Sequence, residues 1–386
     1  MFSERTNWKL TRNRLTEALE QVVASGARLL DLTISNPTRA GLRYDAAPIL
    51  QSLSSPQAMD YDPQPKGLLS ARAAVASYYH TEHETFLEPE HLILTTSTSE
   101  GYSFVFRLLC NPGDELLVPK PSYPLFEFLA DLQDVKLVSY PLLYDHGWQM
   151  DFPSLQKAVT SRTRAVVVVH PNNPTGSFVH PDELDLLNNF SREHSLALIA
   201  DEVFLDYAHN RVARKSFTTN QYVLTFTLSG VSKISALPQM KLAWIVTSGP
   251  EADLEAAQAR LEIIADTYLS MNAPVQSATP ALLDQRKNIQ PQLLDRVLGN
   301  LAELDRQLAA QKTCQRLSVE GGWYAVLRVP VTQTDEELAV DLLRRKFVLI
   351  HPGHFYDFPN DGYLVLSLIT PPDDFREGIQ RLLEMG

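Results

Sequence analysis

The sequence has few cysteines, more acidic than basic residues, and no long apolar run. Its two cysteines, Cys110 and Cys314, are far apart and fit neither a disulfide framework nor a zinc site, so they suit a reducing cytoplasm. No run approaches the ~18 apolar residues that cross a membrane, and the first residues hold no apolar signal core. A net charge of −12 opposes binding to a nucleic-acid backbone. These absences predict a cytoplasmic protein that binds neither nucleic acid nor a membrane.

The 386 residues exceed what one hydrophobic core usually supports, so two domains are expected. Short apolar, β-branched runs recur in the first two thirds of the chain, and most are separated by stretches long enough for a helix. This pattern is typical of a mostly parallel sheet covered by helices on both faces. We therefore predict, over residues 46–275, a large α/β domain with a seven-stranded, mostly parallel sheet, its strands at Leu92–Thr96, Glu115–Pro119, Lys136–Tyr140, Ala165–His170, Leu196–Asp201, Val223–Ser229 and Leu242–Ser248.

The last third mixes helical and strand patterns. A long amphipathic stretch, Pro291–Lys312, is predicted to cross between the domains, and Thr334 and Glu337 form a capping box that begins another helix. We predict a smaller α+β domain from residues 276–386 together with residues 1–45. A helix over Glu251–Met271 is predicted near the end of the larger domain. The further elements of the smaller domain are a helix over Asp373–Met385 and strands over Trp323–Val329, Val348–Pro352 and Tyr363–Ile369.

Lys233 is the lysine best placed for covalent chemistry. It follows a strand in a segment of small and hydroxyl residues, and a second cation, Lys241, lies eight residues further on. A lysine attacks a carbonyl only when its amine can lose its charge, which burial and a nearby positive group favour. The hydroxyl of Ser232 and the charge of Lys241 could hold a phosphate, and an aldehyde cofactor that carries a phosphate is pyridoxal 5′-phosphate. The alternative is a lysine that points into water at a strand end.

Two polar residues follow neighbouring predicted strands. Asn173 opens the turn Asn173-Pro174-Thr175-Gly176, and Asp201 ends its strand. Ligands bind at the carboxyl ends of strands in an open α/β sheet. A carboxylate there, desolvated by its apolar strand, would pair with a cation such as a protonated pyridinium. The alternatives are a plain turn for the first and a capping aspartate for the second.

A hydroxyl-rich segment closes the first strand and opens a predicted helix over Tyr102–Leu109. Thr98 and Ser99 belong to it, and successive amides at a helix N-terminus attract a phosphate. Tyr123, in Pro121-Ser122-Tyr123-Pro124, could stack on a flat ring. Taken alone, these residues would be an ordinary helix cap and a core tyrosine.

The ordered set Asn-Pro-Thr-Gly, Asp-Glu-Val and Ser-Lys, with a cation eight residues on, resembles the fold-type I pyridoxal phosphate (PLP)-dependent aminotransferases of class I/II. The resemblance extends from Asp31 to the last helix. It implies that Lys233 forms a Schiff base with the cofactor and then moves the proton during transfer. It also implies cofactor contacts from Asp201 (pyridinium nitrogen), Asn173 (phenolate oxygen), Tyr123 (ring face), and Thr98, Ser99, Ser232 and Lys241 (phosphate).

The same resemblance implies that Tyr61 reaches the phosphate of a neighbouring subunit, and hence a homodimer with shared active sites. The activity it implies is transfer of an amino group from a small amino donor to a keto or aldehyde acceptor, with no metal. Two alternatives remain open. One is a PLP-dependent lyase of the same fold, such as a C–S lyase or a decarboxylase, and the other is a PLP-binding protein without turnover.

The sequence departs from the family at four positions. Lys241 and Gly230 stand where the family usually has an arginine and often a serine. Phe204 replaces a tyrosine that bonds the phenolate oxygen, although Tyr207 follows closely. Val365 replaces the arginine that clamps the substrate α-carboxylate, so the carboxylate must find another cation, or the substrate is not an ordinary α-amino acid. The other cations considered are Arg39, Arg43, Lys66 and Arg328.

Two histidine-containing segments are given no role. His80-Thr81-Glu82-His83-Glu84 is interpreted as a solvated loop, not a metal site. In the loop His351-Pro352-Gly353-His354, the residue considered for the pocket is His354, with a surface position as the alternative.

Overall fold

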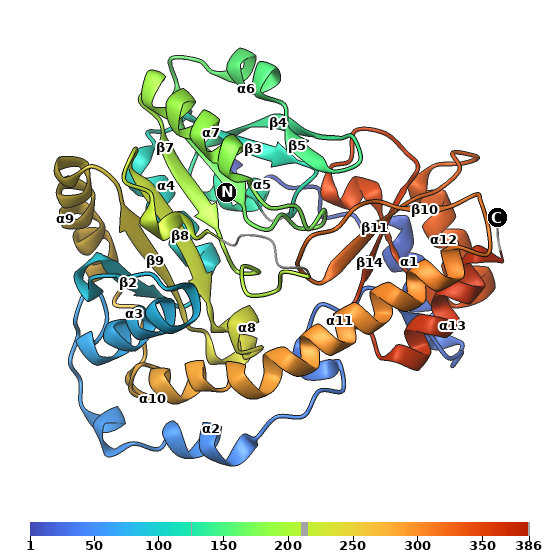
Figure 1. Cartoon of the computed structure of the whole chain (residues 1–386), viewed down its shortest axis with the longest axis horizontal. Coiled ribbons are helices and arrows are strands. Elements are labelled where there is room, and N and C mark those ends of the chain that lie inside the picture. Colours follow the sequence, from blue (N-terminus) through green and yellow to red (C-terminus); the bar gives the residue numbers. More distant parts are fainter. Residues whose placement is uncertain (125, 210–214, 385–386) are drawn as a thin grey trace.

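The computed structural model describes residues 1–124, 126–209 and 215–384. Its larger part is a sheet with strand order β2-β9-β8-β7-β6-β3-β4-β5 (Figure 1). The strand bounds are β2 Leu92–Thr95, β3 Glu115–Lys120, β4 Lys136–Tyr144, β5 Trp148–Met150, β6 Thr163–Val169, β7 Ala197–Asp201, β8 Thr225–Gly230 and β9 Ala243–Ser248. All seven predicted strands are present. Strands β3, β4, β6, β7 and β8 run parallel to one another.

An eighth strand, β5, was missed. It has only three residues and pairs antiparallel with the end of β4, with Tyr144 opposite Trp148. A strand of this length has almost no alternating pattern to detect. Because it pairs with the preceding strand, it extends the edge of the sheet and leaves the parallel centre unchanged.

Strands β3, β6 and β7 are apolar on both faces because helices cover the sheet on both sides. The covering helices are α3 Leu69–His83, α4 Thr98–Leu109, α5 Phe126–Leu132, α6 Phe152–Ala158, α7 Pro181–Glu193, α9 Glu251–Tyr268 and α10 Ala273–Asp284. Helix α4 packs closely on the sheet: a Cβ at Gly101 would lie 2.7 Å from Leu228 Cδ2. A larger residue there would push away the helix whose first turn faces the strand ends.

The register of the parallel strands places the candidate residues at one edge. Val169, the last residue of β6, pairs with Asp201, the last of β7, and Asp201 pairs with Leu228 of β8. The polypeptide therefore leaves all three strands at nearly the same level. Asn173 and Lys233 follow these strand ends directly, which is the arrangement the sequence predicted.

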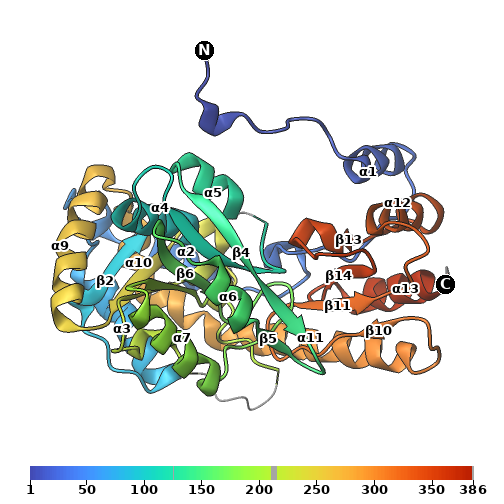
Figure 2. The same ribbon diagram turned by 90° about the horizontal axis from the view of Figure 1, so that it is seen from above.

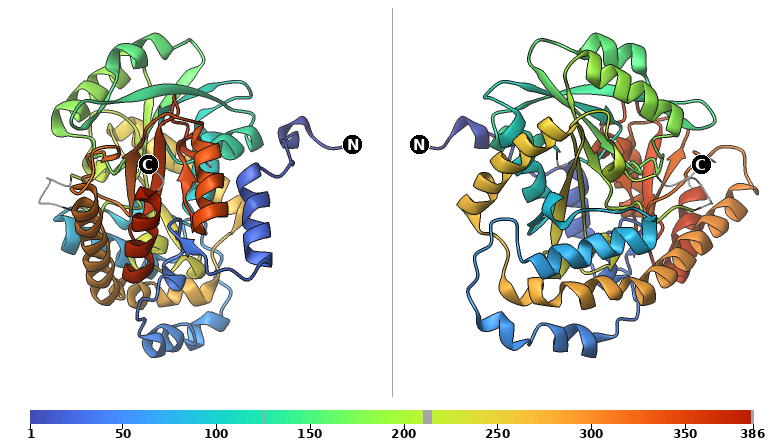
Figure 3. Two further views of the ribbon diagram at one scale, coloured as in Figure 1. Left: turned by 90° about the vertical axis from the view of Figure 1, so that its right-hand side faces the viewer. Right: turned by 60° about the vertical axis from the view of Figure 1, so that its left-hand side comes forward.

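The smaller part is an antiparallel sheet in the order β10-β11-β14-β13, with β10 Gln315–Arg316, β11 Tyr324–Arg328, β13 His351–Pro352 and β14 Tyr363–Ser367. Helix α12 (Asp335–Lys346) begins at the predicted capping box. Figure 3 looks onto this part, where α11 (Arg286–Leu308) and α13 (Pro372–Leu383) lie side by side. The α+β prediction is confirmed.

Three details differ from the predictions. The strand expected over Val348–Pro352 is two strands, because β12 (Val348–Leu349) pairs with β1 (Leu30–Asp31) and only the following β13 joins β14. The long crossing helix, visible in Figure 1, begins at Arg286 and not at Pro291. The last helix ends at Leu383, and the predicted end, Met385, lies outside the described residues.

The N-terminal segment folds against the smaller part, as expected: β1 pairs with β12, and α1 (Arg14–Ala24) packs on α12. Figure 2 shows residues 1–13 running from α1 past α5.

The predicted domain boundary at residue 275 falls inside α10, which packs against α3 of the larger part. This boundary stays a prediction. The remaining α-helix before α3 is α2 (Ala46–Ser52). Across the described residues, no helix has the length and apolar character needed to span a membrane.

Candidate active site

A cavity of about 460 Å³ lies at the carboxyl ends of β6, β7 and β8, and β11, β13 and the following turn wall its other side. Because the two walls come from distant parts of the chain, the site exists only when both sheets are folded. Seven of the nine predicted site residues line this cavity: Thr98, Ser99, Tyr123, Asn173, Asp201, Ser232 and Lys233.

Lys233 lies in the single turn α8 (Val231–Ile234) that follows β8. The hydroxyl of Tyr207 donates a 2.7 Å hydrogen bond to the Lys233 carbonyl and so fixes this turn. The Lys233 ammonium lies 4.8 Å from the ring centroid of Trp323 and 5.3 Å from that of Phe204. Burial lowers the pKa of Lys233 to about 8, and the charge of Asp201 opposes this shift. A substantial neutral fraction near pH 8 makes the amine a nucleophile.

Asp201 is held in a defined orientation. Its carboxylate accepts hydrogen bonds of 3.1 Å from the Tyr102 hydroxyl and 3.1 Å from the Val203 amide. Burial raises the pKa of Asp201 to about 6, while these hydrogen bonds and Lys233 lower it in part. The group is therefore anionic above pH 6 in a desolvated position, where a bound cation stabilises it.

Asn173 is 8% exposed, and its amide oxygen has no hydrogen-bond partner among the described residues. The preceding residue, Asn172, accepts from the Thr175 hydroxyl at 2.9 Å, which fixes the turn. Gly176 has φ +69°, and a Cβ there would lie 2.4 Å from the Gly321 carbonyl. Buried polar atoms are nearly always paired, so the unpaired oxygen shows that the Asn173 side chain is not committed to the protein interior and is available to a ligand in the cavity.

The opposite end of the cavity suits an anion. Thr98 and Ser99 form the first turn of α4, whose amides have no intrahelical acceptor, and Ser97 caps the helix by accepting from the Glu100 amide at 3.2 Å. Ser232 supplies a hydroxyl from α8. The glycine at position 230 has a structural reason, since a Cβ there would lie 2.8 Å from the Leu242 carbonyl. A serine would not fit this contact between β8 and β9 without a shift.

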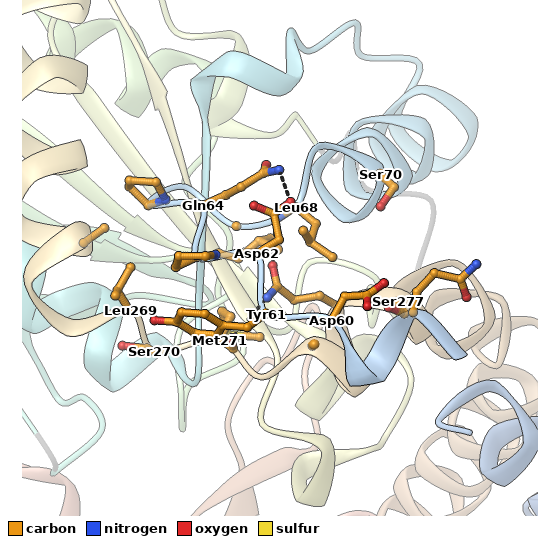
Figure 4. A pocket seen from close by; sticks show the side chains of 18 of the residues that line it. Asp60, Tyr61, Asp62, Gln64, Leu68, Ser70, Leu269, Ser270, Met271 and Ser277 are labelled. Atoms are coloured by element: carbon orange, nitrogen blue, oxygen red, sulfur yellow. Dashed lines mark hydrogen bonds between the residues drawn. The ribbon is translucent and has the colours of Figure 1, made fainter. Parts of the chain in front are cut away.

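The two remaining predicted residues lie elsewhere in this chain. Lys241 is exposed, and does not line the cavity, although it precedes β9, whose first residue Ala243 does. Tyr61 is 84% exposed and lines a second cavity of about 410 Å³ beside Leu269, Ser270 and Met271 (Figure 4). The roles given to both residues stay predictions.

None of the four cations considered for a substrate carboxylate lines the cavity. Arg39, Arg43 and Arg328 are exposed, and the Lys66 ammonium donates to the Glu90 carbonyl at 3.1 Å. Val365 is 1% exposed within β14. Within the described residues, the cavity lining therefore contains no arginine.

Several site residues were not found from the sequence: Ser35, Tyr102, Trp323, Tyr324, His351 and Tyr356. They lie far from Lys233 in sequence and carry no local motif. Tyr102 reaches Asp201 from α4, and the others are brought to the site by the segments on its other side. His351 lines the cavity, whereas His354 is exposed.

The solvated-loop interpretation of residues 80–84 is wrong in part: His83 ends helix α3, its side chain is buried, and it lies 3.0 Å from Asp206. No cluster of metal-ligating side chains occurs in the described part of the chain.

Residues 6–382 match the family model for aminotransferase class I and II. The alanine aminotransferase of Mycobacterium tuberculosis (strain ATCC 25618 / H37Rv) is 29% identical over 93% of this chain and 86% of its own. The glutamate-pyruvate aminotransferase AlaA of Escherichia coli (strain K12) is 29% identical over 96% and 93%. The solved alanine aminotransferase of Pyrococcus furiosus has a TM-score of 0.90 with 22% identity, covering 100% of this chain and 99% of the other, which shows the shared fold.

Proposed function

Because this chain belongs to the class I and II aminotransferases, we propose that it uses pyridoxal 5′-phosphate, held at Lys233, to move an amino group from an amine donor to a keto or aldehyde acceptor. The donor's C–N bond is exchanged for a carbonyl and the acceptor's carbonyl for a C–N bond, so no external oxidant or reductant is needed. The observation that supports this most is the partly buried Lys233, whose pKa is lowered by desolvation, in one cavity with the carboxylate of Asp201.

The cavity residues fit this cofactor. When bound, pyridoxal phosphate supplies an aldehyde and an electron-accepting ring. The carboxylate of Asp201 would keep a proton on the ring nitrogen, and the side-chain NH2 group of Asn173 would donate to the ring's phenolate oxygen. The amides of Thr98 and Ser99 with the hydroxyl of Ser232 receive the phosphate, and Tyr123 covers one ring face.

Lys233 then has two tasks. Its Nζ would hold the cofactor before the donor arrives, and once released by the donor it would be the base that accepts the proton from the donor carbon and the acid that gives it back. The aromatic rings of Trp323 and Phe204 beside Nζ exclude water from it. Since Phe204 has no hydroxyl, and Tyr207 bonds the Lys233 carbonyl, Asn173 is the remaining side-chain donor that we assign to the phenolate oxygen.

We further propose a homodimer in which a second copy covers the face around Tyr61. Exposed apolar side chains gather there: Met59 is 89% exposed and Leu269 41%. Large exposed apolar patches mark interaction sites. Ser270 on this face donates at 2.7 Å to Glu100, which in turn accepts from the Thr96 amide at 2.7 Å. The face is thus connected to the turn that receives the phosphate, and Tyr61 reaches the phosphate of the partner.

Two free cysteines, Cys110 and Cys314, support a cytoplasmic location.

Replacing Tyr61 by phenylalanine should leave the dimer intact and weaken cofactor binding by about tenfold or more, because one hydrogen bond to a charged group contributes about 1.5–3 kcal/mol. Equilibrium dialysis of pyridoxal phosphate would measure the loss, and light scattering the mass. Tyr222→Phe, at another exposed tyrosine, is the control. A protein that stays monomeric at micromolar concentration, or an unchanged affinity in Tyr61→Phe, would contradict the shared site.

Single-turnover chemistry tests the proposed function. Mixed with a donor but no acceptor, a transaminase should release one carbonyl product per site, lose its yellow absorbance, and recover it when an acceptor is added. A lyase would instead release product continuously without an acceptor, and a binding protein would show no spectral change with any amine. Either of these two results would overturn amino-group transfer.

A further inference from the structure

The two walls of the active-site cavity differ in charge. Asp201 and Lys233, the two charged groups of the wall formed by the larger part, are both used by the cofactor in the proposed function. The wall formed by the smaller part presents Ser35, Tyr324, His351 and Tyr356. A substrate that reaches Lys233 while the cofactor occupies the strand ends must lie against this second wall.

All of the polar groups of this second wall are neutral at pH 7. Burial raises the pKa of the Tyr324 and Tyr356 phenols, so both stay protonated. Burial also lowers the pKa of His351, and the charge of Asp31 opposes this only in part. The His351 Nδ1 lies 3.1 Å from the Tyr356 hydroxyl, and the Ser122 amide donates at 3.0 Å to the Tyr356 carbonyl. The pair is therefore held in place between the two walls.

Val365 contributes an apolar side to the same sheet face. It pairs with both Val326 and His351, and directly opposite residues of antiparallel strands share a face. Tyr324, two residues from Val326, is on that face too. A carboxylate placed against this wall would lose hydration, and among the described residues that line the cavity it would find no cation other than Lys233. The guanidinium of Arg328 lies instead over the rings of Tyr144 and Tyr363, at 5.6 and 5.9 Å.

We propose that the donor and acceptor present an uncharged, hydrogen-bonding group, such as a hydroxyl, to His351 and Tyr356, and carry no carboxylate on the carbon that bears the amino or carbonyl group. The substrates are thus amino alcohols or simple amines and the matching hydroxyketones, ketones or aldehydes. His351 and Tyr356 determine this specificity. The inference rests on the proposed function, because it concerns the substrate side of the same cavity.

Matched donors test the inference on the enzyme loaded with pyridoxal phosphate. The loss of yellow absorbance is followed with alaninol against alanine and with phenylalaninol against phenylalanine. The amino alcohol should have at least tenfold higher kcat/KM in each pair. If the amino acids react equally well or faster, the inference is overturned while amino-group transfer stands. If no donor reacts, the proposed function fails and the inference with it.

Variants separate recognition from folding. His351→Phe should raise KM for alaninol about tenfold, and change KM for isopropylamine, which has no hydroxyl, less than twofold. The exposed His354 gives the matched control, His354→Phe, which should alter neither value. A merely structural role of His351 would affect both donors alike, and that result would overturn its assignment. Tyr356→Phe, which keeps the buried ring, should reproduce the selective loss if His351→Phe does not fold.

Discussion

Replacing Lys233 by alanine is expected to lower the rate of amino-group transfer by about 10⁴-fold or more and to abolish the covalent attachment of the cofactor. The amine acts both as the attachment point and as the group that moves the proton, and no other lysine among the described residues lines the cavity. Single-turnover kinetics and the absorbance spectrum would measure the two losses.

The expected loss at Lys233 is specific to that side chain. Lys157→Ala changes an exposed lysine of α6 and should retain full activity and the unaltered spectrum. Thermal unfolding of Lys233→Ala without cofactor shows whether the fold is kept. More than about 1% residual transfer in a folded Lys233→Ala protein would contradict the role given to this amine.

Asp201→Asn is expected to reduce transfer by about 10³-fold while making the cofactor-free protein more stable at alkaline pH. The neutral amide cannot hold a proton on a ring nitrogen, so the ring becomes a poorer electron acceptor. Yet it keeps the shape of the carboxylate and accepts one of the hydrogen bonds that Tyr102 and Val203 now donate. Loss of activity with a gain of stability marks a residue retained for function.

The sign of the stability effect follows from the pKa of Asp201. Folding raises this pKa from its usual 3.8 to about 6, so the folded protein binds the proton more tightly than the unfolded chain. The resulting penalty is absent below about pH 4, grows as the pH rises, and is complete above about pH 6. Asp201→Asn should therefore raise the free energy of unfolding by on the order of 1–3 kcal/mol at pH 8, but not at pH 4.

Urea unfolding of the cofactor-free proteins at both pH values would measure this difference. The control is Asp145→Asn, because the Asp145 side chain is 93% exposed and should show no pH-dependent gain. A variant of Asp201 that is equally destabilised at pH 4 and pH 8 would show that its hydrogen bonds, and not its desolvated charge, dominate.

The cofactor side of the site could be predicted from the sequence because it depends on local patterns. β6 and β7 contain continuous apolar runs and β8 alternates hydroxyl and apolar residues, and the polar residue that matters, Asn173, Asp201 or Lys233, lies at the strand end or within a few residues of it. Parallel pairing then brings these ends to one edge without any need for tertiary detail. The helix cap before Thr98 could be predicted in the same way, because it depends only on neighbouring residues in the sequence.

The substrate side could not be predicted, because it depends on contacts between distant segments. Tyr324 and His351 enter the cavity only through the pairing of β11, β13 and β14, and a residue's direction on such short strands changes with a shift of one position. Tyr207 shows the same limit. Its place near Asp201 left open whether its hydroxyl replaces the one missing at Phe204, and the structure shows that this hydroxyl bonds the backbone of Lys233.

Borohydride reduction of the yellow protein, followed by digestion and mass spectrometry, tests the central role of Lys233 most directly. Reduction makes the bond between the cofactor and its lysine permanent. The added mass should lie on the peptide that contains Lys233 and be absent from the peptides of Lys241 and the other lysines. A label on another lysine, or a reduced protein that carries no cofactor mass, would contradict the site described above.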